Sequence, residues 1–222
     1  MTPVQTTPAR TTPAQTTSAQ TTSAQTTPAD QVRRGRPRSE QADRAIIDAA
    51  LDLFAESGAE GLCIEKVAAR AGVGKATIYR RWPGKEDLLL AALASLRAPL
   101  PEPKGESVRD DLVALLDTMR AESIDPRQAR QFALLLGEGA RYPRLIERYV
   151  EAVVEPRRDV FRTVLRRGIA TGELRERVNI ELAVDMLTGA VLAKTARLSQ
   201  ERADRGYGRR VVDELLTGIA SR

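Results

Sequence analysis

Two short helices joined by a turn are predicted by the stretch Gly61-Leu-Cys-Ile-Glu-Lys-Val-Ala-Ala-Arg-Ala-Gly-Val-Gly-Lys-Ala-Thr-Ile-Tyr-Arg-Arg-Trp-Pro-Gly-Lys-Glu-Asp-Leu88. Gly72 stands where the chain turns, because glycine tolerates the positive φ that sharp turns often need, and Val73 would plug the angle between the helices. The second helix, from Lys75 to Trp82, ends before Pro83, which cannot continue it. This layout is typical of a helix-turn-helix DNA reader. The apolar residues expected to face inward are Ile64, Val67, Ala68, Ala71 and Ile78.

Positive charge is concentrated in the same stretch. Between residues 61 and 85, the single acid Glu65 faces six cations: Lys66, Arg70, Lys75, Arg80, Arg81 and Lys85. The resulting local charge of +5 equals the net charge of the whole chain. DNA phosphates favour such a surface. The alternative is an ordinary helix pair with a solvated basic face, but an exposed Tyr-Arg-Arg on a short second helix favours DNA binding.

The residues from Val73 to Leu88 resemble the recognition-helix region of the tetracycline-repressor (TetR) family of transcriptional regulators. The preceding Ala45-Ile-Ile-Asp-Ala-Ala-Leu-Asp-Leu-Phe-Ala-Glu-Ser-Gly58 is similar to that family's first helix. The resemblance implies an all-α homodimer with an N-terminal three-helix DNA-binding domain, followed by a helical-bundle domain for dimerisation and effector binding. It also implies a repressor that a small-molecule ligand releases from a palindromic operator.

The family pattern also implies the DNA contacts. Tyr79 and Arg80 would touch the DNA backbone, and Lys85 would meet a phosphate at the start of the next helix. The residues that the resemblance places at the major groove are Lys75, Ala76, Thr77 and Tyr79.

Two positions depart from the family pattern. Cys63 stands where the family usually has a Thr or Ser that caps the helix and touches phosphate, and cysteine is a poor cap. The tyrosine is followed by Arg80-Arg81-Trp82 instead of the common His-Phe pair. The arginines strengthen the expectation of phosphate contact, and Trp82 keeps the apolar plug.

Two unusual segments precede the first helix, which we expect to begin with Ser39 as its cap and to end at Gly58. Residues 31–38, Gln-Val-Arg-Arg-Gly-Arg-Pro-Arg, contain no acid and resemble the extended hooks that enter narrow minor grooves. DNA contact is therefore expected from Arg34, Arg36 and Arg38, with a solvated basic tail as the alternative. Residues 5–29 repeat a Thr-Thr pentapeptide without a large apolar residue, so residues 1–32 should be disordered. That repeat has no function, or serves as a spacer or a modification site.

Composition excludes several classes of protein. The chain has one cysteine and no histidine, which rules out an internal disulfide and removes the usual general base and the commonest zinc ligand. The sequence contains no phosphate-binding glycine loop, metal-ligand cluster or serine nucleophile motif. No apolar stretch approaches the roughly 20 residues of a membrane span, and the N-terminus lacks a signal peptide's apolar core. We therefore expect a cytoplasmic protein that is not an enzyme and uses no metal or cofactor.

Beyond the breaker Pro99-Leu-Pro-Glu-Pro-Lys-Gly105, only amphipathic helices are expected. The predicted division is a tail of residues 1–32, a DNA-binding domain of residues 33–85 with its basic arm, and an all-α effector-binding and dimerisation domain of residues 86–222. Pro156 either kinks one long helix or starts a new one.

The last two helices are the expected dimer surface. Residues 180–198 are unusually apolar and rich in small side chains, and residues 208–220 carry a further apolar stripe. Two such helices from each protomer would make a four-helix interface about a two-fold axis. The alternative is that these stripes only complete the core of one protomer.

An apolar cavity between the helices would hold the unknown small-molecule effector. Each candidate lining residue is otherwise an ordinary core residue, and the sequence leaves the effector's identity open. Two other functions also stay open, an architectural DNA-binding protein without a ligand response and a transcriptional activator. The candidate ligand-binding residues are Met119, Phe132, Leu135, Tyr142, Tyr149 and Phe161.

Overall fold

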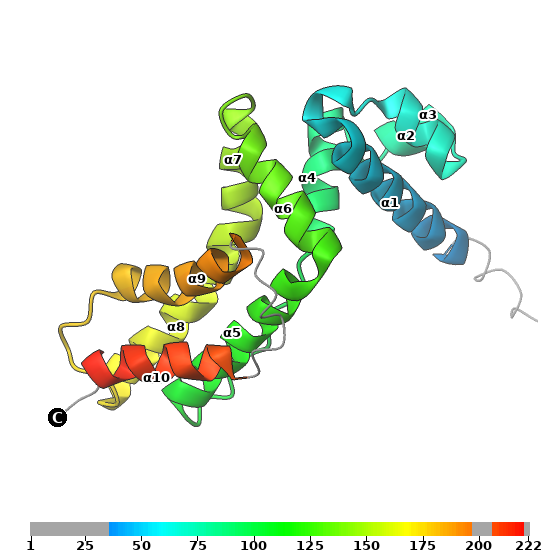
Figure 1. Cartoon of the computed structure of the whole chain (residues 1–222). Helices are drawn as coiled ribbons and strands as arrows, with labels where there is room; N and C mark the ends of the chain where they lie inside the picture. Colours follow the sequence, from blue (N-terminus) through cyan, green and yellow to red (C-terminus); the bar gives the residue numbers. More distant parts are fainter. Residues whose placement is uncertain (1–35, 197–205, 220–222) are drawn as a thin grey trace, which may run out of the picture. The chain divides into compact units, whose positions relative to one another are not determined.

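A computed structural model describes residues 36–196 and 206–219, and its secondary-structure elements are all helices (Figure 1). The predicted all-α fold is therefore confirmed. In chain order the elements are α1 (Arg36–Gly61), α2 (Ile64–Ala71), α3 (Lys75–Tyr79), α4 (Lys85–Ser95), α5 (Val108–Ile124), α6 (Pro126–Glu138), α7 (Pro143–Tyr149), the π-helical turn η1 (Val150–Val154), α8 (Glu155–Thr171), α9 (Ile180–Ala196) and α10 (Tyr207–Ile219).

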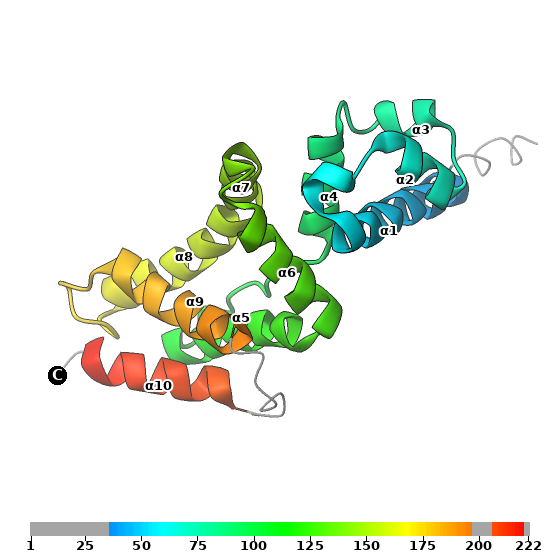
Figure 2. The ribbon, with the colours of Figure 1, turned by 45° about the horizontal axis from the view of Figure 1, so that its top comes forward.

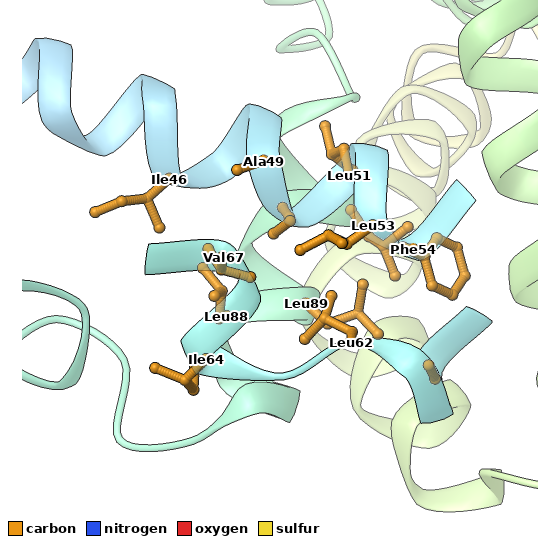
Figure 3. Close-up of a cluster of buried hydrophobic side chains, with 14 of the residues drawn as sticks. Ile46, Ala49, Leu51, Leu53, Phe54, Leu62, Ile64, Val67, Leu88 and Leu89 are labelled. Carbon is orange, nitrogen blue, oxygen red and sulfur yellow. The ribbon is translucent and has the colours of Figure 1, made fainter. Parts of the chain in front are cut away.

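The first four helices share an apolar core. Figure 3 shows side chains of α1, α2 and α4 gathered into one cluster, with Ile46, Val67 and Leu88 among them. Ile78 of α3 is fully buried in the same cluster, while Val73 and Trp82 pack against its edge. The predicted inward positions of the helix-turn-helix are thus confirmed for Ile64, Val67, Ala68 and Ile78, whereas Ala71 is half-buried.

The ends of two helices differ from the prediction. The second helix of the motif ends at Tyr79 rather than at Trp82, because the turn that follows leads into Pro83. The first helix begins at Arg36 rather than after Ser39, since a proline is tolerated in the first turn of a helix, where its missing N–H has no intrahelical partner. Gly58 interrupts this helix with φ 68°, so the break expected at that glycine is present.

The proline-rich segment between α4 and α5 has no helix, as predicted, and a buried aspartate holds its end. The carboxylate of Asp111 accepts the backbone N–H groups of Lys104 (2.8 Å) and Gly105 (3.1 Å), and it lies 2.8 Å from the guanidinium of Arg167. The segment is therefore anchored to the first turn of α5 and to α8.

A second core cluster joins α5, α8, α9 and α10. Leu112 of α5, Phe161 of α8, Val184 of α9 and Val212 of α10 are fully buried in it. α10 runs alongside α5 and α9 in Figure 1 and in the turned view of Figure 2. One face of each C-terminal helix therefore completes the core of a single protomer.

Pro156 lies in the first turn of α8, which follows η1 directly without a break in helical geometry. Backbone angles stay right-handed helical at Val150, Val154 and Glu155, and the Glu155 N–H donates to the Val150 carbonyl five residues earlier. A proline has no N–H to donate and its ring crowds the preceding turn. The chain accommodates this with the wide turn η1 between α7 and α8, a device that is frequent at functional sites.

Candidate nucleic-acid interface and internal cavity

The turn before α3 has the backbone geometry that requires glycine. Gly72 adopts the left-handed conformation with φ 65° and ψ 32°, and the Val73 N–H donates to the Ala68 carbonyl at 3.0 Å. A Cβ atom at Gly72 would meet no heavy atom within 4 Å. Glycine is therefore needed here for its backbone freedom and not for space.

Burial of Ile78 fixes which face of α3 points outward. Tyr79 is 50% exposed, Thr77 is half-buried, and the other predicted contact residues Lys75, Ala76 and Arg80 are exposed. The structure thus brings these five residues to one short, anchored segment with an accessible outer surface. Their contact with DNA stays a prediction.

The cations around α3 are more strongly paired than the sequence indicated. Lys75 lies 3.3 Å from Glu65, Arg70 lies 2.7 Å from Glu56, and Arg81 is paired with Asp43. Two of these acids belong to α1, outside the stretch that was counted. A hydrogen bond from Arg70 lowers the pKa of Glu56 below its ordinary value.

Two of the cations donate to backbone carbonyls of the protein itself. Arg81 also donates to the Thr77 carbonyl at 3.1 Å, which makes it a clamp between α1 and α3. Lys85 donates to the Ala59 carbonyl at 3.2 Å, and an ammonium group has two more N–H groups for a phosphate. Cys63 precedes α2 in an extended conformation without a capping side-chain hydrogen bond, as expected for a cysteine.

The structure revises the basic arm. Arg34 lies outside the described residues. Arg36 and Arg38 belong to the first turn of α1, so the extended conformation expected for residues 36–38 is wrong. The physical reason is that the fixed φ of proline also fits the first turn of a helix, where its missing N–H has no intrahelical partner.

A cavity of about 320 Å³ lies among the C-terminal helices. Aliphatic and aromatic side chains make up most of its wall, with charged side chains from α5, α8, α9 and the end of α4. The lining residues are Arg97, Met119, Glu122, Gln128, Ala129, Phe132, Tyr149, Val153, Val154, Arg157, Arg158, Phe161, Asp185, Thr188, Gly189, Val191 and Leu192.

Four of the six candidate ligand-binding residues meet in this wall, namely Met119, Phe132, Tyr149 and Phe161. Leu135 and Tyr142 do not line it. Leu135 lies about one turn beyond Phe132, where α6 enters the first core cluster, and Tyr142 packs against that cluster. Helical spacing predicts the inward face of α6 but not the point along it where the cavity ends.

Sequence reasoning missed the charged end of the cavity. Glu122, only 6% exposed, accepts hydrogen bonds from Arg97 (3.4 Å), from Arg157 (3.0 Å to each oxygen) and from the Ala98 N–H (2.9 Å). Arg97 also donates to the Tyr149 hydroxyl at 3.1 Å. These residues lie on α5, α7, α8 and the segment after α4, so no local pattern signals that they meet.

None of the helices in residues 36–196 and 206–219 has the length and apolar character to cross a membrane. Over the same residues, no group of three or more Cys, Asp or Glu side chains is arranged to hold a metal ion.

Both halves of the chain match sequence models of known protein families. Residues 46–92 match the sequence model of bacterial regulatory proteins of the tetR family, and residues 102–215 match that of the tetracyclin repressor-like C-terminal domain. The uncharacterized HTH-type transcriptional regulator YdeS of Bacillus subtilis (strain 168) is 34% identical over 192 residues, which span 85% of this chain and 95% of YdeS. The DNA-binding transcriptional repressor TetR of Mycobacteroides abscessus is 28% identical over 186 residues, spanning 82% and 96% of the two chains.

Solved structures show the same fold. The crystal structure of the TetR family transcription regulator SCO0332 has a TM-score of 0.59 and 27% identity, over 81% of this chain and 99% of that one. The transcriptional regulator FadR from Bacillus subtilis, solved in complex with stearoyl-CoA, has a TM-score of 0.57 and 19% identity, over 79% and 98%.

Proposed function

The chain belongs to the TetR family of DNA-binding transcriptional regulators, and on this premise we propose that it is a homodimeric repressor that leaves a palindromic operator when a small molecule enters its cavity. The structure of the α2–α3 unit is the main support for this proposal. It presents an exposed tyrosine and cations on a short helix whose other face is buried. The alternatives are a transcriptional activator and an architectural protein without a ligand response.

We assign operator contact to the outer surface around α3. The proposed base and backbone contacts are Lys75, Ala76, Thr77, Tyr79, Arg80 and Lys85, with Arg34, Arg36 and Arg38 adding charge from the N-terminal side. Lys75 would exchange its exposed partner Glu65 for a phosphate. Such an exchange is feasible because exposed ion pairs contribute little stability.

The proposed dimer surface is the outer face of α9 together with α10, within residues 180–198 and 208–220. Leu182 and Met186 of α9 are large apolar side chains that one protomer leaves exposed, and neither lines the cavity. A large exposed apolar face on a soluble domain marks an interaction surface. A two-fold dimer would present one α3 helix to each half of a palindromic site.

Substitution of both Leu182 and Met186 by glutamate tests this surface. We expect monomers in analytical ultracentrifugation and weaker operator binding, because charge on both copies of the face repels its partner. Leu136→Glu is the matched control, since Leu136 is 53% exposed on α6 and lies outside the proposed surface. A dimer that survives the double substitution would contradict the assignment.

Release by a ligand is supported by the position of the cavity's charged end. Arg97 and Ala98 follow directly after α4, and both contact Glu122 of α5. α4 in turn shares the first core cluster with α2 and α3. A ligand that rearranges these contacts would act on α4, which connects the α2–α3 unit to the cavity. Control of DNA binding by a ligand requires a physical connection of this kind between the two sites.

We also propose a division of the chain into three parts. These are a tail of residues 1–32, a reader of residues 33–85 and an effector-binding and dimerisation domain of residues 86–222. A regulator that binds the operators of a bacterial chromosome would work in the cytoplasm, without catalytic activity of its own.

The decisive experiment measures fluorescence anisotropy of the purified chain with duplexes that tile the DNA beside its own gene. A scrambled duplex and two salt concentrations serve as controls. One tight, sequence-selective tile supports the repressor, whereas equal and steeply salt-dependent binding to every duplex favours the architectural alternative.

The variant Tyr79→Ala tests the reading surface in the same assay. We expect selective binding to weaken while the dimer stays intact. The control Leu136→Ala removes a side chain of similar exposure elsewhere and should change nothing. Equal binding by Tyr79→Ala and the unchanged chain would contradict the assigned recognition helix.

A further inference from the structure

The charged end of the cavity holds more buried positive charge than buried negative charge. Two guanidinium groups, on Arg97 and Arg157, face the single carboxylate of Glu122. Their side chains are only 20% and 16% exposed, against 6% for the carboxylate. A buried charge without a partner is unfavourable, so this group of three favours a further anion.

The carboxylate is already fully engaged. One oxygen of Glu122 accepts from the Ala98 N–H and Arg157, and the other accepts from Arg157 and Arg97. A cationic ligand would have to displace two arginines from it. Each guanidinium has five N–H donors. Arg97 donates to the Tyr149 hydroxyl and to Glu122, and Arg157 donates to Glu122 and to the Ala98 carbonyl (2.6 Å), so these hydrogen bonds occupy fewer than five donors on each arginine.

The remaining charged pair in the wall does not reverse this balance. Arg158 lies 2.7 Å from Asp185, whose side chain is 60% exposed. Its other acidic neighbours, Glu155 and Glu181, stand outside the lining. Three carboxylates therefore pair with Arg158, whereas Arg97 and Arg157 share one, so an anion favours the end with Arg97 and Arg157.

The wall beside this charged end is apolar. Phe132, Val153, Phe161, Val191 and Leu192 contribute hydrocarbon surface from four different elements. The guanidinium carbon of Arg97 lies 4.9 Å from the centre of the Phe132 ring, so the positive and apolar surfaces are directly continuous. A ligand that matches both surfaces has a negative head and a hydrocarbon body.

We propose that the cavity binds an amphipathic organic anion, with a carboxylate at Arg97 and Arg157 and its apolar body along Phe132 and Phe161. This inference rests on the proposed function, because it names the ligand class of the same cavity. The expected head is a single carboxylate, since one further negative charge balances two guanidinium groups and one glutamate.

Three probes with the same ten-carbon chain test the ligand class: decanoate, decan-1-ol and decylamine. Near neutral pH these heads are negative, neutral and positive. Isothermal titration calorimetry on the full chain should show that decanoate binds most tightly and decylamine most weakly. Arg97→Met should weaken decanoate binding by roughly tenfold, as expected for the loss of a charged hydrogen bond, and leave decanol binding unchanged. Arg148→Met is the control, because Arg148 pairs with Asp87 and lies outside the lining.

A second variant does not depend on the arginines. Gly189 lines the cavity, and a Cβ atom built on it would meet no heavy atom within 4 Å. Gly189→Met should therefore fold, because methionine is also a better helix former than glycine. Its side chain would fill the cavity and weaken both decanoate and decanol binding.

Three outcomes would overturn the inference: decylamine binds most tightly, Arg97→Met binds decanoate as well as the unchanged chain does, or none of the probes binds. The operator assay separates this inference from the proposed function. A chain that selects one DNA tile but binds no probe keeps the DNA reader and loses the ligand class. A chain that binds decanoate through Arg97 but selects no tile keeps the ligand class and loses the repressor.

Discussion

Replacement of Glu122 by glutamine should destabilise the protein strongly, although it removes only one charge. The substitution leaves Arg97 and Arg157 largely buried without their shared counter-ion. Removal of one partner from a buried ion pair costs about 3–5 kcal/mol. The lower end, about 3 kcal/mol, applies here because a glutamine oxygen still accepts one hydrogen bond and both arginines keep some contact with water. For a domain of this size that loss lowers Tm by roughly 6–12 °C.

Differential scanning calorimetry at two salt concentrations checks this expectation. Glu181→Gln is the control, because Glu181 lies 2.8 Å from Arg162 but its side chain is 56% exposed. The control should lose little stability, and salt should diminish that loss, whereas the loss in Glu122→Gln should persist in salt. If both variants unfold within one degree of the unchanged chain, the group around Glu122 is not the buried charge centre that we infer. Glu122→Gln should also bind decanoate more tightly, since the positive charge at the head site increases.

Three further expectations follow from the geometry. Gly72→Ala and Gly172→Ala should each lower the free energy of unfolding in urea by about 1 kcal/mol, because both glycines have a positive φ and open space at Cβ; a loss at one position only would contradict a purely backbone cause. Burial raises the pKa of Asp111, but two backbone N–H donors and an arginine outweigh burial, so the pKa of Asp111 is lowered. Its contribution to stability is present above the unfolded pKa and is lost as pH falls through the folded pKa. The free energy of unfolding of Asp111→Asn should therefore fall less steeply than that of the unchanged chain in an acid titration. Arg80→Gln should reduce the salt slope of DNA binding by about one, whereas Arg81→Gln should mainly lower thermal stability, because Arg81 is paired within the protein; a larger change in salt slope for Arg81 would reverse these roles.

Local patterns in the sequence were sufficient to predict the reader. Ile64, Val67 and Ile78 occupy the spacing that one helix face requires, and all three are buried. The left-handed conformation of Gly72 follows from its position between two amphipathic helices. These features depend on neighbours within a few residues, which is the range over which helical periodicity acts.

The charge pattern of the reader was less predictable because its partners are distant in sequence. Counting residues 61–85 gave six cations and one acid, yet Arg70 and Arg81 are paired with Glu56 and Asp43 of α1. An amphipathic pattern shows that a side chain is exposed but not which other helix lies beside it. The positive charge available to DNA is therefore smaller than the net charge of residues 61–85.

The apolar residues of the cavity could also be predicted from local sequence patterns, whereas its charged residues could not. Periodicity identified Phe132, Tyr149 and Phe161 as inward residues, and all three line it. Glu122, Arg97 and Arg157 were not singled out, because each looks like an ordinary surface charge on its own segment. Pro156 stayed ambiguous because a proline signals a break, and only the surrounding turns show that a π-helical turn absorbs it.

The group around Glu122 links these observations into one mechanism for control. A ligand can shift a conformational equilibrium only by the difference in its affinity for the two states. An anion bound at Arg97 and Arg157 competes with Glu122, whose oxygens also hold the Ala98 N–H just beyond α4. The anion would thus bind most tightly to the conformation in which Glu122 has released one arginine. In that conformation the contact between Glu122 and Ala98 can also change, and with it the position of α4. Coupling of about 1–3 kcal/mol, the usual range, would change operator affinity roughly 5- to 150-fold. By the reciprocity of binding free energies, saturating operator DNA should weaken decanoate binding by the same factor.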